Sequence, residues 1–127
     1  MVTTPVLGSE SALIRVADGM VVCSDLTVAD RWWPRFRGLL GKRGIEPHEG
    51  LLIRPARSIH MFWMRFAIDA VFLDADGEIR HIAGDLRPWR VASCRSAREV
   101  VELRAGRAAA LGLSAGQRLA VSPPRSS

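Results

Sequence analysis

The sequence predicts a mainly β domain of the α+β class: a small antiparallel β-barrel or folded sheet with one packed helix and one short C-terminal helix. Residues 58–77 contain two consecutive strand-like runs, and many other short apolar runs are bounded by Gly, Pro, Asp or Ser. Residues 31–40 carry the one strong repeat of apolar side chains at helical spacing. Together these patterns favour a β fold with a helix packed against it.

The chain of 127 residues is long enough for one domain with its own hydrophobic core. We expect a disordered or frayed N-terminus over residues 1–10, a single globular domain over 11–122 and a tail over 123–127. No apolar run approaches the length of a membrane helix, and the N-terminus lacks the basic and apolar regions of a secretory signal. The pattern therefore predicts a cytoplasmic protein whose cysteines, Cys23 and Cys94, are free thiols.

Two strands and a helix are expected in the first third of the domain. Residues 12–16 and 20–26 have strand-like composition and are joined by a hairpin signal, Ala-Asp-Gly. A helix then follows over about residues 31–40, with Asp30 as its N-cap and Thr27 as the alternative. Its aromatic side chains are expected to pack in the core rather than to stack on a ligand.

The centre of the chain carries two polar residues within apolar strands. Residues 59–64 form an apolar run that includes His60 and no charge, which predicts a buried strand. Residues 67–74 alternate as a second strand, which contains Asp69 and pairs with residues 78–82. Because a buried unpaired charge is costly, we expect Asp69 to be buried, ionised and hydrogen-bonded to backbone amides or an arginine.

The remaining elements are short and are separated by turn residues. Pro88 cannot donate to a β-ladder, so the segment around it is interpreted as a loop. The expected elements are strands over 51–54, 91–94, 99–103 and 118–121, a loop over 86–90 and a small helix within 105–111.

Several short motifs follow one another in a distinctive order. An Arg-Gly-Leu turn precedes a Trp-Met segment, which precedes an Asp on a strand that ends in Phe-Leu-Asp. The motif positions are Arg37, Gly38, Leu39, Met64, Asp69, Asp74 and Gly106. This order, over roughly residues 20–121, resembles the domain of unknown function 192 family of small uncharacterised conserved proteins. The resemblance implies a fold but no reaction, and this chain has Arg-Phe-Ala-Ile where many members have Lys-Asn-Thr and a longer link.

Arginine and tryptophan side chains in or beside turns form the predicted binding set. Guanidinium groups bind carboxylate or phosphate in a bidentate manner and also stack on Trp. We expect residues 54–65 and 86–90 to converge around one opening. This predicts a non-enzymatic binding module, without a cofactor, for a small anionic ligand, a peptide or a protein partner. The predicted binding residues are Arg54, Arg57, Trp63, Arg65, Arg87, Trp89 and Arg90.

Other residue sets allow different functions. His60, Asp69 and Cys94 supply a base, an orienting acid and a nucleophile, so an alternative is a thiol- or acid/base-dependent enzyme. His60, Met64 and Cys94, with Met61 nearby, have ligand atoms that suit Cu(I). They lack the close spacing of a metal site, so no metal is predicted.

The net charge of +5 allows a second alternative, weak nucleic-acid binding. All but one of the 18 basic residues are arginine, and they are scattered along the chain. Scattered charge offers no single track for a phosphate backbone, so neither a specific nucleic acid nor a membrane is expected as a partner.

Overall fold

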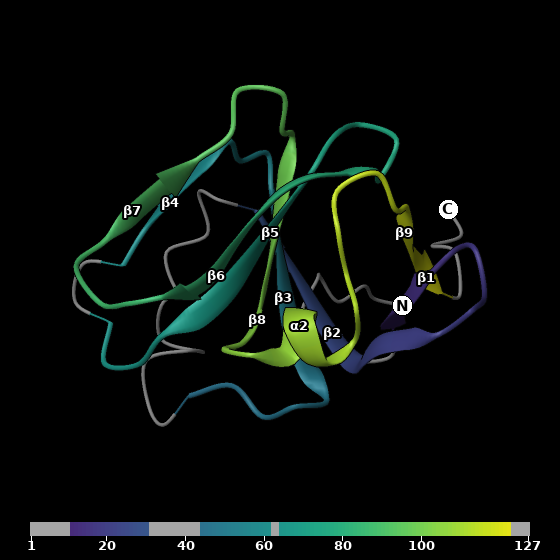
Figure 1. The fold of residues 1–127 in the computed structure, drawn as a ribbon, viewed down its shortest axis with the longest axis horizontal. Helices are drawn as coiled ribbons and strands as arrows, with labels where there is room; N and C mark the ends of the chain where they lie inside the picture. Colours follow the sequence, from purple (N-terminus) through teal and green to yellow (C-terminus); the bar gives the residue numbers. More distant parts are fainter. Residues whose placement is uncertain (1–10, 31–43, 62–63, 123–127) are drawn as a thin grey trace, which may run out of the picture.

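A curled sheet of seven strands and a separate two-stranded arm make up the fold (Figure 1). The computed structural model describes residues 11–30, 44–61 and 64–122, so the predicted helix over 31–40 lies outside the described residues. The elements are β1 (Ser11–Arg15), β2 (Val21–Asp30), β3 (Glu49–Arg54), β4 (Ser58–His60), β5 (Ile68–Leu73), β6 (Ile79–Leu86), β7 (Val91–Ser93), β8 (Glu99–Arg104), α2 (Arg107–Ala110) and β9 (Leu119–Ser122). Within these residues no helix has the length and apolar character needed to cross a membrane.

The seven-stranded sheet has the order β6-β5-β8-β3-β2-β1-β9. Its neighbours are antiparallel except for β2 and β3, which run parallel. The expectation of a fully antiparallel sheet was therefore wrong at this one pair. A parallel pair needs a crossover of a dozen or more residues, and residues 31–48 supply that length between the two strands.

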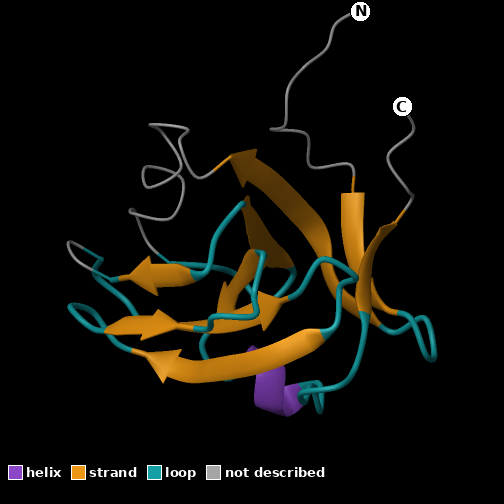
Figure 2. Ribbon diagram, turned by 90° about the horizontal axis from the view of Figure 1, so that it is seen from above, coloured by secondary structure: helices purple, strands orange, loops and turns teal. Residues whose placement is uncertain are grey.

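The sheet curls until its two ends approach each other (Figure 2). The segment before β9 meets the start of β6, where a bridge joins Glu78 to Arg118. The Ile79 amide donates to the Gln117 carbonyl at 2.7 Å, and the Leu119 amide donates to the Gly77 carbonyl at 2.9 Å. These bonds close one end of a half-barrel, which confirms the predicted folded β architecture.

The central strands are buried on both faces, and so the domain has two hydrophobic cores. On β5, Val71 and Leu73 point into the first core, which lies inside the curl. Ile68, Ala70 and Phe72 point into the second core on the outside of the sheet. The alternation read from the sequence is real, but here it separates two apolar faces rather than a core from solvent.

Two strand boundaries differ from those expected. β2 continues to Asp30 and is therefore longer than the strand expected over 20–26. The helix for which Asp30 or Thr27 was predicted as the N-cap lies outside the described residues. Of the strand expected over 59–64, the described residues form β4, and His60 at its end is exposed rather than buried. The physical reason is that β4 pairs with β7 alone, so one side of it faces solvent. The other predicted strands and the short C-terminal helix are confirmed.

Candidate functional site

Most of the predicted binding residues lie on the arm formed by β4 and β7 and on the turn at its end. β4 and β7 pair antiparallel. The pairing is extended by the Met61 amide, which donates to the Arg90 carbonyl at 2.8 Å, and by the Trp89 amide, which donates to the Met61 carbonyl at 2.9 Å. Of the two segments expected to converge, residues 57–61 lie beside residues 89–94 along this arm.

The arm has two faces because its side chains alternate. Ile59 and Ala92 are half-buried and pack against the second core. His60 and Val91 stand opposite each other on the other side, where both are exposed, Val91 to 59%. We call this side the outer face of the arm; it also carries two exposed serines, Ser58 and Ser93.

Trp89 occupies the turn that leads into β7, and its side chain is 56% exposed. Its backbone has φ of +70°, a region that bulky residues rarely adopt. The turn is closed by the Arg90 amide, which donates to the Arg87 carbonyl at 3.2 Å. Together with the Met61 contacts, this network holds an exposed tryptophan on a left-handed backbone. Backbone strain of this kind is concentrated at functional sites.

Three exposed arginines lie on or beside the arm: Arg87 and Arg90 are in the turn with Trp89, and Arg57 precedes β4 at the other end of the arm. The Arg57 carbonyl accepts from the Cys94 amide at 2.8 Å, which fixes the backbone beside β4. The Arg87 guanidinium lies 3.2 Å from the Asp85 carboxylate, and both side chains are largely exposed. An exposed pair of this kind is worth little energy and separates readily.

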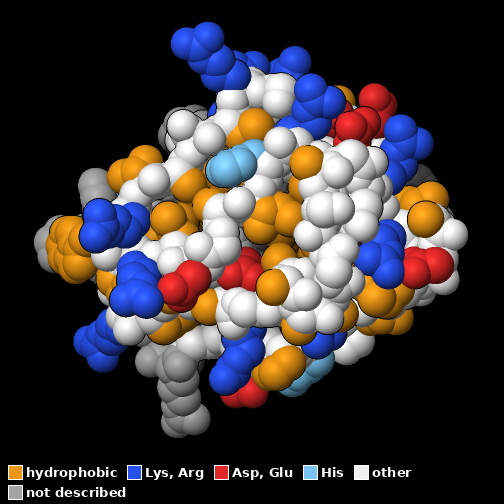
Figure 3. Space-filling model, in the orientation of Figure 1, with side chains coloured by type: hydrophobic (Ala, Val, Ile, Leu, Met, Phe, Trp, Pro, Cys, Tyr) orange, Lys and Arg blue, Asp and Glu red, His pale blue; other side chains and the backbone are white. Residues whose placement is uncertain are grey.

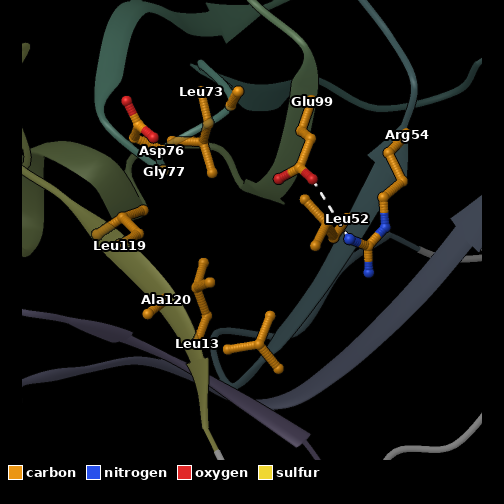
Figure 4. A pocket seen from close by; sticks show the side chains of 11 residues that line it. Leu13, Leu52, Arg54, Leu73, Asp76, Gly77, Glu99, Leu119 and Ala120 are labelled. Carbon is orange, nitrogen blue, oxygen red and sulfur yellow. Dashed lines mark hydrogen bonds and ion pairs between the residues drawn. The ribbon is translucent and has the colours of Figure 1, made fainter. Parts of the chain in front are cut away.

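The rest of the predicted set lies elsewhere. Trp63 lies outside the described residues, and Arg65 is exposed in the bend that leads into β5. Arg54 lines a different pocket, between β3, β9 and the β5–β6 turn, where its Nη1 atom is 3.4 Å from Glu99 Oε2 (Figure 4). The prediction that Arg54 shares one opening with Arg87 and Arg90 is therefore corrected, because the end of β3 faces the inside of the curl rather than the arm.

Asp69 is 2% exposed and bonds to backbone amides, as its position in an apolar strand predicted. Its Oδ1 accepts from the amide of Asp85 at 2.9 Å, and its Oδ2 accepts from the amide of Ala108 at 2.8 Å. The Gly106 amide donates to both oxygens at 3.1 Å. Gly106 itself has φ of +91° and no side chain to cap α2, so a carboxylate from β5 satisfies the first amides of that helix.

Other family-motif positions also have structural roles. Gly106 is the partner of Asp69, and Met64 packs half-buried against the second core. Asp74 Oδ1 accepts from the amides of Asp76 (2.8 Å) and Glu78 (3.0 Å), which builds the β5–β6 turn. Partial burial opposes ionisation of Asp74, but these amides prevail and lower its pKa. The motif positions Arg37, Gly38 and Leu39 lie outside the described residues.

The three residues of the enzymatic alternative lie in three different environments. Asp69 is committed to backbone amides, and His60 is exposed on the outer face of the arm. Cys94 packs on the inner side against the second core, with its Sγ atom 3.5 Å from Ser96 Oγ. This arrangement gives a thiol hydrolase no support within the described residues.

Both cysteines are free, as the sequence predicted. Cys23 is completely buried in the first core, and burial raises the pKa of its thiol to about 12. A thiol in that environment stays protonated and behaves as a small apolar side chain.

One group of described residues could supply ligands to a metal ion, and the sequence analysis did not identify it. Ligand atoms of Asp25, His48 and Glu49 all lie within 4.8 Å of one another. The parallel register of β2 and β3 pairs Asp25 with Glu49, which only the tertiary fold reveals. Glu49 Oε1 already accepts from the Glu46 amide at 2.9 Å, and the group lies near the surface, so we assign no metal to it.

The sequence analysis also missed Val91 and Glu99. Val91 was expected only as part of a brief strand. In the structure its neighbour Ala92 is half-buried, and because side chains alternate along a strand, Val91 faces outward. The alternation of side chains between the two faces of a strand was the available signal for residues 91–94. A strand this short is not long enough to show which side chains face the core and which face solvent. Glu99 gave no signal, because its contact with Arg54 joins two strands that are far apart in sequence.

Comparison with known proteins shows relatives of unknown function. A UPF0127 protein of Thermococcus sibiricus is 35% identical over 83 residues, which span 61% of this chain and 53% of that protein. A UPF0127 protein of Pyrococcus furiosus is 31% identical over 114 residues, which span 84% of this chain and 95% of that protein. This chain thus covers about half of the first relative and nearly all of the second.

Two solved structures share the fold. A Sinorhizobium meliloti protein described as a proposed transcription regulator superimposes with a TM-score of 0.73 and 27% identity, over 88% of this chain and 92% of that one. A protein of unknown function from Novosphingobium aromaticivorans gives a TM-score of 0.71 at 19% identity, over 87% of this chain and 82% of that one. The model of the family DUF192, described as an uncharacterised ACR, matches residues 13–121. The chain therefore belongs to the DUF192 family.

Proposed function

We propose that the protein is a non-enzymatic binding module that docks an acidic peptide segment of a protein partner on the outer face of the arm and the adjoining 87–90 turn. The observation that carries the proposal is the exposure of Trp89 and Val91, at 56% and 59%, on a turn held by hydrogen bonds to Met61. Exposed tryptophan is the side chain most often found at the energetic centre of a protein interface.

Charge selects the kind of partner. Arg87 and Arg90 are exposed in the same turn as Trp89, and Arg57 is exposed at the other end of the arm. Asp85 is the acidic group in contact with Arg87. A glutamate or aspartate of a partner would take the place of Asp85 with little loss, because the exposed pair is weak. Arginine forks bind carboxylates through two parallel hydrogen bonds, and the exposed part of the Trp89 indole adds apolar contact area.

The rigidity of the arm supports binding rather than chemistry. The backbone of Trp89 is fixed on both sides before any partner arrives, so docking costs little conformational entropy. Ile59 and Ala92 anchor the inner face to the second core, which keeps the outer face in a constant orientation. A preorganised apolar patch with a basic rim is typical of a recognition surface.

Fluorescence anisotropy of a labelled peptide tests the proposal. The probe alternates Glu and Val, and its matched control has Lys in place of every Glu. At near-physiological salt we expect saturable binding of the Glu peptide alone. Arg90→Ala is expected to weaken it by about tenfold or more, since one charge-assisted hydrogen bond contributes about 1.5–3 kcal/mol. Trp89→Ala is expected to have an effect of similar size, because truncating an aromatic residue at the centre of an interface costs about 2 kcal/mol or more.

Arg118→Ala is the control, because Arg118 is exposed beside β9, on the opposite side of the molecule from the arm (Figure 1). Equal loss from Arg118→Ala and Arg90→Ala would show that net charge alone attracts the peptide and would contradict the proposal. Equal binding of the Lys peptide would contradict it as well. Thermal melts of each variant confirm that the fold is intact.

Nucleic-acid binding is expected to be weak and independent of sequence, even though one structural neighbour is described as a proposed transcription regulator. Lys and Arg side chains are spread among acidic and apolar ones on the face seen in Figure 3, without a continuous basic track. Anisotropy with labelled duplex and single-stranded DNA at rising salt is the measurement. We expect only weak, salt-sensitive binding. Tight binding to one sequence at near-physiological salt would instead favour a nucleic-acid function for the arm.

A further inference from the structure

A concave site lies beside the contact between Gly77 and Leu119 that closes the curl, away from the arm. It has a volume of about 190 Å³ and is bounded by β1, β3, β9 and the turn between β5 and β6 (Figure 4). Leucines form its floor, and each is at most 3% exposed: Leu13, Leu52, Leu73 and Leu119. The volume is below the roughly 300–1,000 Å³ of sites for drug-sized molecules, so the site suits a ligand of a few carbon atoms.

Charged side chains stand at the rim above this floor. Arg54 Nη1 and Glu99 Oε2 are 3.4 Å apart, and Asp76 lies across the pocket from them. Glu99 is partly buried, which raises the pKa of its carboxyl group, and the neighbouring Arg54 opposes that shift. Two carboxylates and one guanidinium therefore share the mouth, so a purely anionic ligand would meet net repulsion there.

We propose that this pocket binds a free aliphatic α-amino acid of about the size of leucine. The apolar side chain would lie on the leucine floor, where its burial is favourable. The α-carboxylate would bind the fork of Arg54, and the α-ammonium group would bind Glu99. The α-carboxylate and the α-ammonium group are attached to the same carbon atom. They can therefore reach Arg54 and Glu99 together, because these two side chains are in contact at one rim.

The contact between Arg54 and Glu99 is suited to being opened by such a ligand. It is a single long ion pair, with Arg54 46% and Glu99 23% exposed. A zwitterion supplies a carboxylate to the arginine and an ammonium to the glutamate, so neither side chain loses its counter-charge when the pair separates. A simple carboxylate would leave Glu99 unpaired, and a simple amine would leave Arg54 unpaired.

Three probes separate these cases in titrations followed by two-dimensional amide NMR: L-leucine, 4-methylpentanoate and 3-methylbutylamine. They share an aliphatic body and carry, respectively, both charges, the negative charge alone and the positive charge alone. We expect saturable L-leucine shifts at Leu52, Gly77 and Leu119, with a dissociation constant at or below about 1 mM. The two single-charge probes should bind at least tenfold more weakly.

Arg54→Gln and Glu99→Gln should each reduce L-leucine affinity at least tenfold, whereas Arg95→Gln, at an exposed residue outside the pocket, should leave it unchanged. Val121→Phe, which enlarges a half-buried side chain of the pocket lining, should abolish the shifts, and a thermal melt checks that this variant remains folded. Absence of saturable shifts with L-leucine would overturn the inference. It would equally be overturned if 4-methylpentanoate bound as tightly as L-leucine, or if the shifts mapped to the arm. None of these results depends on the acidic-peptide proposal, because the pocket and the arm share no residue.

Discussion

Replacement of Asp69 by alanine is expected to lower the free energy of unfolding by about 3–5 kcal/mol, because several buried or part-buried amides lose a charged acceptor at about 1–3 kcal/mol each. The amides belong to Asp85, Gly106 and Ala108, and they come from the end of β6 and the start of α2. One side chain therefore ties three segments together inside the domain. No other side-chain acceptor is recorded for these three amides in the described residues.

Urea denaturation of purified variants measures this effect. Asp69→Asn keeps one acceptor oxygen in place of two. Its free energy of unfolding should therefore fall between that of the wild type and that of Asp69→Ala. Asp76→Ala is the matched control, since Asp76 is exposed and a surface substitution usually changes stability by about 0.5 kcal/mol or less. A loss below about half a kcal/mol for Asp69→Ala would show that water replaces the carboxylate at these amides.

Local patterns predicted the strands well because their information lies within a few residues. The period-two alternation from Ile68 to Leu73 defines β5, and the proline at position 88 ends the pairing of β6 before the turn. The isolated carboxylate of Asp69 predicted its own burial and its amide partners, since burying a charge requires compensation. These inferences depend on chemistry that any folded arrangement must satisfy.

Features that depend on distant pairing could not be predicted in this way. The parallel register of β2 with β3 brings Asp25 to Glu49, and the curl brings Arg54 to Glu99. His60 was expected to be buried because its neighbours in sequence are apolar, yet pairing with β7 alone leaves it on the outer side. The sequence predicted a single binding set, but only the topology separates Arg54 at the pocket from Arg87 and Arg90 at the arm.

Gly77→Ala is expected to cost about 2–4 kcal/mol, because strain and collision act at the same position. Gly77 has φ of +85°, and a Cβ atom there would lie 2.4 Å from the Leu119 carbonyl oxygen. That oxygen belongs to the backbone of β9, which cannot move aside like a flexible side chain. The collision falls where the Leu119 amide bonds to the Gly77 carbonyl, the contact that joins β9 to the β5–β6 turn.

Gly19→Ala separates the two causes. Gly19 has φ of +72°, yet nothing lies within 4 Å of a Cβ built on it. Its substitution should therefore show the backbone strain alone, at roughly 1–2 kcal/mol. The difference between the two variants in urea melts measures the collision with β9. Losses that agree within about 0.5 kcal/mol would contradict a tight closure of the curl. A clear excess for Gly77→Ala would show that the contact between the β5–β6 turn and β9 holds the half-barrel, and with it the pocket, together.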